Sequence, residues 1–310
     1  MIVKNKRSLW TKIKMQKYLL LMLSPALILV AVFHYAPLYG WIMAFTHYRI
    51  GHPILAGEFT GLLQFRRFFG SNDLGWLLRN TLVINVSSIV LNLVVAVILT
   101  ILLKEVLWKF GAKVVQTVSF FPFFISWVMA YAVVAQLLSV NTGLINRLMV
   151  EWGVIDRGIN FLGNPNYSWG LMIIMNMWRW TGHNTIIFLA AVSGISPEMY
   201  EAASLDGANR FQKVRFITLP HLLPTLCVML ILNSGWVLNN SLEQFFIFTN
   251  ATNWERMEVL DMYIFRFGIR LLDFSYATAV GIVRSIVSII LLFLVNHIVK
   301  QLSSREISVF

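Results

Sequence analysis

The chain has 310 residues, of which 58% are hydrophobic and only 13% are charged. A water-soluble domain of this size carries about 25% charged residues, so this composition and the mean hydropathy of +0.71 exclude an ordinary soluble fold and indicate a polytopic membrane protein. The net charge of +11 fits basic residues at membrane–water boundaries better than a nucleic-acid-binding surface. A single cysteine, Cys227, excludes an internal disulfide.

Six apolar runs are each long enough to cross a bilayer, which requires roughly 20 predominantly apolar residues. The first run is interrupted by Pro25 and Pro37 and is expected to form one kinked helix, and Pro122 predicts a kink in the third run. The first run lacks an A-x-A-like cleavage site, so we expect it to be retained. The predicted fold is an all-α membrane protein with one domain over residues 18–299 and six transmembrane helices, at about 18–45, 82–103, 114–138, 170–192, 222–242 and 277–299.

Basic residues are distributed unevenly between the predicted sides of the membrane. A tail over residues 1–17 carries six Lys and Arg residues and no acidic residue. With this tail inside, the inner segments hold 14 basic residues and the longer outer loops hold 9, which is the asymmetry expected of short cytoplasmic segments. The N-terminal tail, the C-terminal tail over residues 300–310 and the loop between the fourth and fifth runs are therefore predicted to be cytoplasmic.

That loop, residues 196–220, is predicted to form two short helices with a bend between them. Ser196 is expected to cap the first helix, and Gly207 can adopt the left-handed conformation that ends it. Asn209 is then placed to begin the second helix through a capping box, and Pro220 is expected to stop that helix.

The same loop carries a regularly spaced motif. Glu201-Ala202-Ala203 is followed after three residues by Gly207 and, nine residues later, by Ile217-Thr218-Leu219-Pro220. This spacing resembles the EAA loop of binding-protein-dependent ABC importer permeases. The resemblance implies a cytoplasmic coupling helix that docks on an ATPase subunit, with coupling residues Glu201, Ala202, Ala203, Asp206, Gly207, Leu219 and Pro220. The alternative, an ordinary amphipathic helix pair, explains the capping but not the spacing.

Five shorter motifs lie outside this loop, at residues 35–40 (YAPLYG), 44–48 (AFTHY), 61–65 (GLLQF), 79–81 (RNT) and 178–182 (W-x-W-T-G). In this order they are similar to the oligosaccharide branch of the same family, the LplB-like permeases of polysaccharide-fragment importers. Gln64 is a departure, because that branch usually has Asn there. The segment around Gln64 is also expected to open a short surface helix.

Two stripes of polar side chains are predicted inside the membrane, where such groups are costly. In the fourth run Asn176, Arg179 and His183 lie three and four residues apart and share one helix face. In the fifth run a second stripe at the same spacing comprises Asn233, Trp236, Asn240, Glu243 and Gln244. We expect these stripes to line a substrate path, where amides and a guanidinium bind saccharide groups and indoles stack on pyranose rings. The alternative is that they cross-link packed helices.

Three arginines of the membrane tract, Arg179, Arg284 and Arg270, favour an acidic saccharide such as a uronate oligomer. For Arg284 the sequence leaves three possibilities open: snorkelling to the membrane surface, contact with an anionic substrate, or an ion pair across helices with Glu243 or Asp273, of which the ion pair is favoured. Asn85 and Asn92 are expected to form packing hydrogen bonds, and Trp127 is expected to belong to the core or to a lipid-facing belt rather than to a ligand platform.

The chain contains no G-x-x-x-x-G-K-[ST], H-E-x-x-H or G-x-S-x-G motif. We therefore expect no catalytic residue, metal site or cofactor in this chain, with ATP and Mg held by a separate ATPase. The predicted function is that of the permease subunit of an ATP-driven ABC importer in the cell membrane, which moves an oligosaccharide into the cytoplasm by alternating access.

The resemblance implies four kinds of partner: a second homologous permease, two ABC ATPase subunits, an extracytoplasmic substrate-binding protein and membrane lipid. No nucleic acid is expected. Two alternatives stay open at this point. One is an importer of another solute such as glycerol phosphate, and the other is a membrane-embedded glycan or lipid enzyme or an assembly factor.

Overall fold

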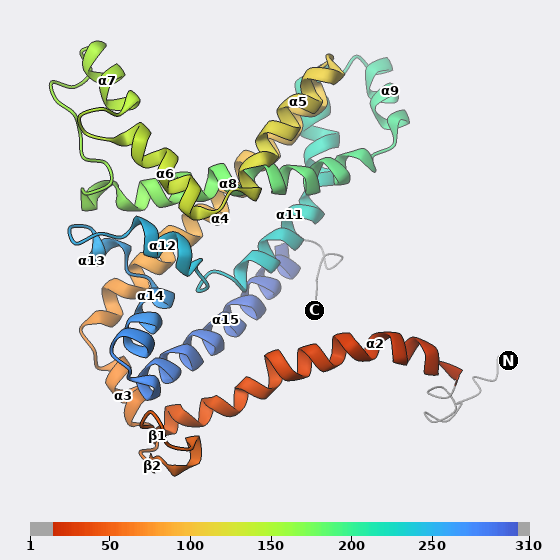
Figure 1. Cartoon of the computed structure of the whole chain (residues 1–310). Helices are drawn as coiled ribbons and strands as arrows, with labels where there is room; N and C mark the ends of the chain where they lie inside the picture. The colour runs from red at the N-terminus through yellow and green to blue at the C-terminus, as the bar shows by residue number, and fades with distance from the viewer. Residues whose placement is uncertain (1–14, 303–310) are drawn as a thin grey trace. The chain divides into compact units, whose positions relative to one another are not determined.

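The computed structural model describes residues 15–302, and within them the chain is almost entirely helical (Figure 1). Most of the two tails predicted at residues 1–17 and 300–310 lies outside these described residues. The chain divides into two compact units. One unit runs up to Phe68 and includes Phe267–Ile282, and the other comprises Phe69–Arg266 and the chain from Val283 onward.

The first unit contains a continuous apolar helix of 29 residues, Lys17–Phe45. It begins as α2 (Lys17–Val30) and continues through a π-helical segment, Ala31–Tyr35, and a 3-10 segment, Ala36–Phe45. These two changes of helix type surround Pro37, which cannot donate a backbone hydrogen bond in a regular α-helix. No side chain within the described helix α2 is buried, as expected of a helix whose apolar surface faces lipid.

A small antiparallel hairpin follows, formed by β1 (Thr46–His47) and β2 (Glu58–Phe59), and leads into α3 (Leu63–Phe69). The short helix predicted after residue 61 is thus confirmed, although Gln64 is buried rather than on the surface. The start of α15 (Phe274–Leu302) completes this unit. Its packing includes the buried residues Ala44 and Ala279 and an ion pair of 2.6 Å between Arg67 and Asp273.

The second unit holds the other helices and the cavity described below. Its elements are α4 (Asp73–Glu105), α5 (Lys109–Phe120), α6 (Trp127–Leu138), α7 (Leu144–Glu151), α8 (Pro165–Ser193), α9 (Pro197–Leu205), α10 (Arg210–Lys213), α11 (Leu219–Ser234), α12 (Leu242–Phe248), α13 (Trp254–Met257), α14 (Leu260–Phe265) and the rest of α15. Helices α4 and α8 make the most extensive contact between any two elements of the described chain and form the centre of this unit. One buried link between them is the hydrogen bond of 2.7 Å that Asn184 donates to Asn92.

Helix α5 approaches α8 unusually closely at Gly182. A Cβ atom at this position would lie 2.0 Å from the carbonyl oxygen of Ser119 and 2.6 Å from the backbone nitrogen of Phe120. Only glycine leaves room for this contact between two main chains. The glycine of the W-x-W-T-G motif therefore has a packing role in this fold.

The third apolar run is bent far more sharply than a proline kink alone would produce. Its two halves, Lys109–Phe124 and Trp127–Leu138, are bent by 108° relative to a straight helix. Pro122 lies in a 3-10 turn, Phe121–Phe124, and Ser126 then begins α6 by accepting a hydrogen bond from the backbone N–H of Met129. The predicted kink near Pro122 is confirmed. The direction in which the chain continues is set by the new helix start at Ser126.

The fifth run also differs from its prediction. Helix α11 ends at Ser234, residues 235–241 are not helical, and α12 starts at Leu242. Gly235 and the adjacent pair Asn239-Asn240 are poor helix formers, because glycine is flexible and asparagine side chains compete for backbone hydrogen bonds.

In the loop at 196–220, the bend and the second cap are confirmed. Gly207 has φ of 77°, and Asn209 forms both bonds of a capping box with Gln212. The side chain of Ser196 makes no capping hydrogen bond. The prediction that Pro220 stops the second helix was wrong. Proline lacks a backbone N–H, and the π-helical segment Val214–Thr218 directly before it relaxes the regular α-helical hydrogen bonding, so the helix continues through Pro220 instead of ending there.

By length and composition, four described helices can each cross a membrane: Lys17–Phe45, Asp73–Glu105, Arg210–Ser234 and Phe274–Gln301. The bent pair at residues 109–138 can form a fifth span. Helix α8 is equally long, at 29 residues, but it carries several amide and basic side chains.

Candidate functional site

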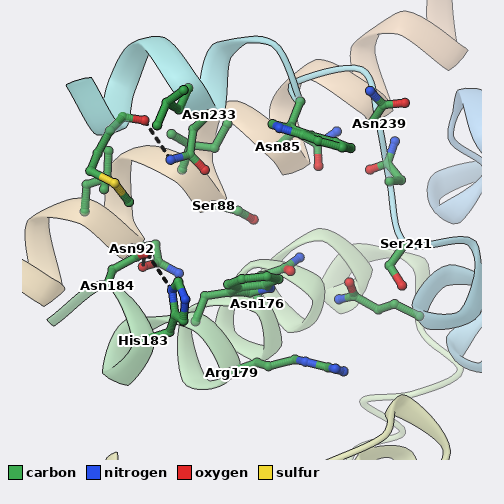
Figure 2. Close-up of a pocket in the computed structure, with 18 of the residues that line it drawn as sticks. Asn85, Ser88, Asn92, Asn176, Arg179, His183, Asn184, Asn233, Asn239 and Ser241 are labelled. Atoms are coloured by element: carbon green, nitrogen blue, oxygen red, sulfur yellow. Dashed lines mark hydrogen bonds between the residues drawn. The ribbon is translucent and has the colours of Figure 1, made fainter. Parts of the chain in front are cut away.

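A cavity of about 780 Å³ lies in the second unit (Figure 2). Its walls are side chains of α4, α8, α11 and α12 and of the non-helical residues 235–241. In Figure 2 the side chains of α8 face Asn233 and Asn239 across the cavity. The lining is mostly apolar by surface but includes many polar side chains: Asn85, Ser88, Asn92, Asn176, Arg179, His183, Asn184, Asn233, Asn239, Asn240, Ser241, Glu243 and Gln244.

The cavity brings together all seven residues predicted for the substrate path: Asn176, Arg179, Asn233, Trp236, Asn240, Glu243 and Gln244. However, the prediction that the five residues from Asn233 to Gln244 share one face of a single helix was wrong. These residues do not form one helical stripe, because α11 ends before Trp236 and α12 begins after Ser241. They face one cavity because residues 235–241 fold along its wall.

Two hydrogen bonds hold this non-helical segment in place. Asn85 of α4 donates from Nδ2 to the carbonyl oxygen of Val237 at 2.6 Å. The backbone N–H of Asn240 donates to Oδ2 of Asp261 at 2.6 Å. The segment that carries Trp236, Asn239, Asn240 and Ser241 is thus attached to α4 at one point and to α14 at another.

The amides of the cavity fall into two groups. Asn92 and Asn184 bond to each other, Asn85 bonds to Val237, and Asn233 donates to the carbonyl oxygen of Met229 at 2.7 Å. The expectation that Asn85 and Asn92 form packing hydrogen bonds is therefore confirmed, although both also line the cavity.

By contrast, Asn240 and Arg179 keep buried polar atoms without a partner. Both Oδ1 and Nδ2 of Asn240, and Nε and Nη1 of Arg179, have no hydrogen-bond partner within the described residues. A buried polar group without a partner is costly in a folded protein. These atoms are therefore the best placed in the cavity to bind a ligand.

Arg179 lies against an aromatic surface. Its guanidinium carbon is 4.5 Å from the ring centroid of Trp127, which is buried and belongs to the core as expected. Trp127 also lines the cavity next to the arginine, which its position in an apolar run did not indicate. Further along α8, the ring of His183 stacks on Phe123 at 4.7 Å, and Trp180 meets Phe123 edge to face at 5.2 Å.

Arg284 has a partner that the sequence did not suggest. It forms an ion pair with Asp261, so neither Glu243 nor Asp273 is its counter-ion. Burial raises the pKa of Asp261, while the positive charge of Arg284 and the N–H of Asn240 oppose that rise. Because Arg284 is neutralised in this way, and Arg270 has interactions of its own, the case for an anionic substrate rests on Arg179.

The predicted coupling residues are mostly exposed. Glu201, Ala202, Asp206 and Gly207 are accessible, whereas Ala203 packs against a core cluster that includes Phe188 and Ile217. Leu219 and Pro220 are also exposed, in the first turn of α11.

The loop is attached to the helices beneath it by several side-chain contacts. Tyr200 shares a hydrogen bond of 3.0 Å with Thr218, and Nζ of Lys104 lies 4.8 Å from the ring centroid of Tyr200. Among residues 15–302, no group of three His, Cys, Asp or Glu side chains is placed to hold a metal ion.

Comparison with known proteins places this architecture in a family. Residues 92–305 match the family described as binding-protein-dependent transport system inner membrane component. The polygalacturonan/rhamnogalacturonan transport system permease protein YteP of Bacillus subtilis (strain 168) is 38% identical over 303 residues, which cover 98% of this chain and 94% of that protein. Protein LplB of the same strain is 35% identical over 289 residues, covering 93% and 90% of the two chains.

A solved structure agrees with these relatives. A chain from a bacterial ABC transporter involved in the import of the acidic polysaccharide alginate has a TM-score of 0.86 and 31% sequence identity, and the match covers 95% of this chain and 99% of that chain. The chain therefore belongs to the family of binding-protein-dependent transport system inner membrane components, the membrane-embedded permeases of ABC importers.

Proposed function

We propose that this permease moves an acidic, uronate-containing oligosaccharide into the cytoplasm by alternating access, through the cavity between α4, α8, α11 and α12. The observation that carries the proposal is Arg179, a half-buried arginine in the cavity wall whose buried Nε and Nη1 atoms have no hydrogen-bond partner within the described residues. A carboxylate can accept two parallel hydrogen bonds from a guanidinium. Glu243 of the same cavity interacts with this charge but forms no ion pair with it, so a neutral sugar would leave the guanidinium without a directly bonded anion, which is unfavourable away from water.

The rest of the cavity suits the remainder of such a ligand. Amide side chains both donate and accept hydrogen bonds, as sugar hydroxyls require. The indoles of Trp180 and Trp236 both line the cavity and both are exposed, and their faces can stack on the apolar faces of pyranose rings. The relatives support the same class of solute, because they are described as permeases for polygalacturonan and rhamnogalacturonan and as an importer of alginate.

For the membrane topology, we propose six spans with both termini in the cytoplasm. The four apolar helices, the bent pair at 109–138 and helix α8 supply six segments of sufficient length. The distribution of basic residues supports this orientation. It also leaves the loop at 196–220 on the cytoplasmic side, where an ATPase can reach it.

The proposed assembly contains a second homologous permease, two ABC ATPase subunits that hold ATP and Mg, and an extracytoplasmic substrate-binding protein. A solved relative with a TM-score of 0.87 was crystallised with an alginate pentasaccharide-bound periplasmic protein, which supports the last of these partners. In this assembly, closure of the ATPase subunits acts on the exposed residues Glu201, Ala202, Asp206 and Gly207.

The substrate proposal can be tested with a pair of solutes that differ only in charge. The complete importer, reconstituted in proteoliposomes with its binding protein, is supplied with trigalacturonate or with its fully methyl-esterified form. Wild type is expected to take up the acid in preference to the ester. Arg179→Gln is expected to reduce uptake of the acid at least about tenfold, because a charge-assisted pair contributes roughly 1.5–3 kcal/mol.

A matched control is Arg147→Gln, which removes the same charge from an exposed side chain whose ion pair is with Glu151 at 3.9 Å. This variant is expected to behave as wild type. Normal uptake of the acid by a folded Arg179→Gln importer would contradict the proposed role of the cavity. Preference of wild type for a polyol phosphate over both saccharides would contradict the substrate class.

A further inference from the structure

A second group of cationic side chains lies outside the cavity. Arg79 of α4 and Arg256 of α13 both approach the indole of Trp169 in α8, with their guanidinium carbons 5.3 Å and 4.9 Å from its ring centroid. Trp76 and Trp254 lie beside this group and meet edge to face at 6.1 Å. Three helices that are distant in the sequence thus place two arginines among three indoles.

Neither guanidinium is neutralised by an acidic side chain. Within the described residues, no carboxylate lies within ion-pair distance of Arg79 or Arg256. The nearest acidic residue in sequence, Glu255, is exposed and forms no ion pair with either of them. The aromatic ring of Trp169, rather than a counter-ion, holds the two arginines, since a cation is attracted to the face of an indole.

The position of this group relative to the cavity is set by helix α8. Asn176, which lines the cavity, follows Trp169 by seven residues, so the two lie on nearly the same helix face and about 10 Å apart along the axis. The opposite end of α8 leads into the loop at 196–220. If that loop is cytoplasmic, the group at Trp169 lies at the extracytoplasmic end of the helix that lines the cavity.

We propose that Arg79 and Arg256, held over Trp169, form a carboxylate-binding site that receives the acidic oligosaccharide before it enters the cavity. The inference rests on the proposed function, because it assumes a uronate-containing solute. Two planar guanidinium groups can bind carboxylates in a bidentate manner. Trp254 is 47% exposed and offers a surface on which a pyranose ring can stack. An oligomer of several sugar units can contact this site and Arg179 in succession along one face of α8.

The site can be disrupted with little effect on the fold. Trp169 donates from Nε1 to the backbone carbonyl oxygen of Arg256 at 2.9 Å, and a change in the arginine side chain leaves that hydrogen bond intact. The test uses Arg79→Gln, Arg256→Gln and the double variant in the complete reconstituted importer. Arg147→Gln is the charge-matched control, and thermal unfolding confirms that each variant is folded.

Initial uptake rates are measured against the concentration of trigalacturonate or its methyl ester, with the binding protein in excess. Each single variant is expected to raise the half-saturating concentration of the acid about fivefold, which corresponds to roughly 1 kcal/mol for a partly exposed charged contact. The double variant is expected to raise it further, with the maximal rate within about twofold of wild type. Uptake of the ester is expected to stay unchanged.

Two results would overturn the inference. One is a half-saturating concentration for the acid that is the same in the double variant as in wild type. The other is an equal loss for acid and ester together with a higher requirement for binding protein, which would mean that the arginines contact that protein instead. Failure of the proposed function looks different, because wild type itself would then show no preference for the acid over the ester.

Discussion

The close main-chain contact between α5 and α8 at Gly182 gives a quantitative prediction for Gly182→Ala. The added methyl group would lie 2.0 Å from the carbonyl oxygen and 2.3 Å from the carbonyl carbon of Ser119. Both are main-chain atoms, so no side-chain rotation relieves the overlap, and α5 and α8 must separate. Overpacking of this kind costs about 1–3 kcal/mol, and the higher helix propensity of alanine returns at most about 1 kcal/mol.

A net loss of about 1–2 kcal/mol is therefore expected, which lowers the unfolding temperature of a chain of this size by about 2–4 °C. Separation of α5 from α8 also displaces Arg179 and His183, which lie on either side of Gly182 in sequence, so uptake is expected to fall. The matched control is Gly170→Ala on the same helix, where a Cβ atom meets nothing within 4 Å. That variant is expected to be as stable as wild type or slightly more stable, because alanine favours helix.

Thermal unfolding of the detergent-solubilised importer compares the two variants. If Gly182→Ala unfolds at the same temperature as Gly170→Ala, the argument from main-chain contact is refuted.

Three further predictions concern other parts of the second unit. Asp261→Asn leaves Arg284 half-buried without a counter-ion and is expected to destabilise the chain by about 3 kcal/mol, whereas combining Asp261→Leu with Arg284→Met should restore much of that loss in thermal unfolding. Burial raises the pKa of Glu258 despite its ion pair with Arg266. Because the folded protein binds the Glu258 proton more tightly than the unfolded chain does, this proton stabilises the fold fully below the unfolded-state pKa of about 4.3, and the stabilisation is lost as pH rises through the higher folded-state pKa. Glu258→Gln should therefore remove this part of the pH dependence of unfolding. Gly207→Pro forbids the observed φ of 77° and is expected to abolish stimulation of the partner ATPase by loaded binding protein, whereas Gly207→Asn should retain it.

Local structure could be predicted where a few neighbouring residues determine it. The left-handed glycine at Gly207 and the capping box at Asn209 follow from short-range chemistry, and the structure contains both. The break near Pro122 follows from the missing backbone donor. Its angle of 108° does not, because it depends on how α6 restarts at Ser126 and packs.

Residues that face the cavity were found by their polarity rather than by their secondary structure. An amide or guanidinium in an apolar run stands out wherever the chain folds, so the seven predicted path residues gather around one cavity even though residues 235–241 are not helical. Partners across the fold could not be predicted in the same way. Arg284 pairs with Asp261, and Trp169 meets Arg79 and Arg256, only because distant segments pack together.

The uninterrupted helix Arg210–Ser234 has a mechanical consequence. Its 25 residues extend over about 37 Å, from the bend at Gly207 to Asn233 in the cavity wall. A rod of this length that tilts by about 10° around its midpoint moves each end by about 3 Å. The hydrogen bond of 2.6 Å between Asn85 and the carbonyl oxygen of Val237 lies just beyond the end of the rod, and a stretch of about 1 Å already takes such a bond beyond hydrogen-bond distance. A modest push at the cytoplasmic loop is therefore large enough to detach one wall of the cavity from α4 without unwinding the helix.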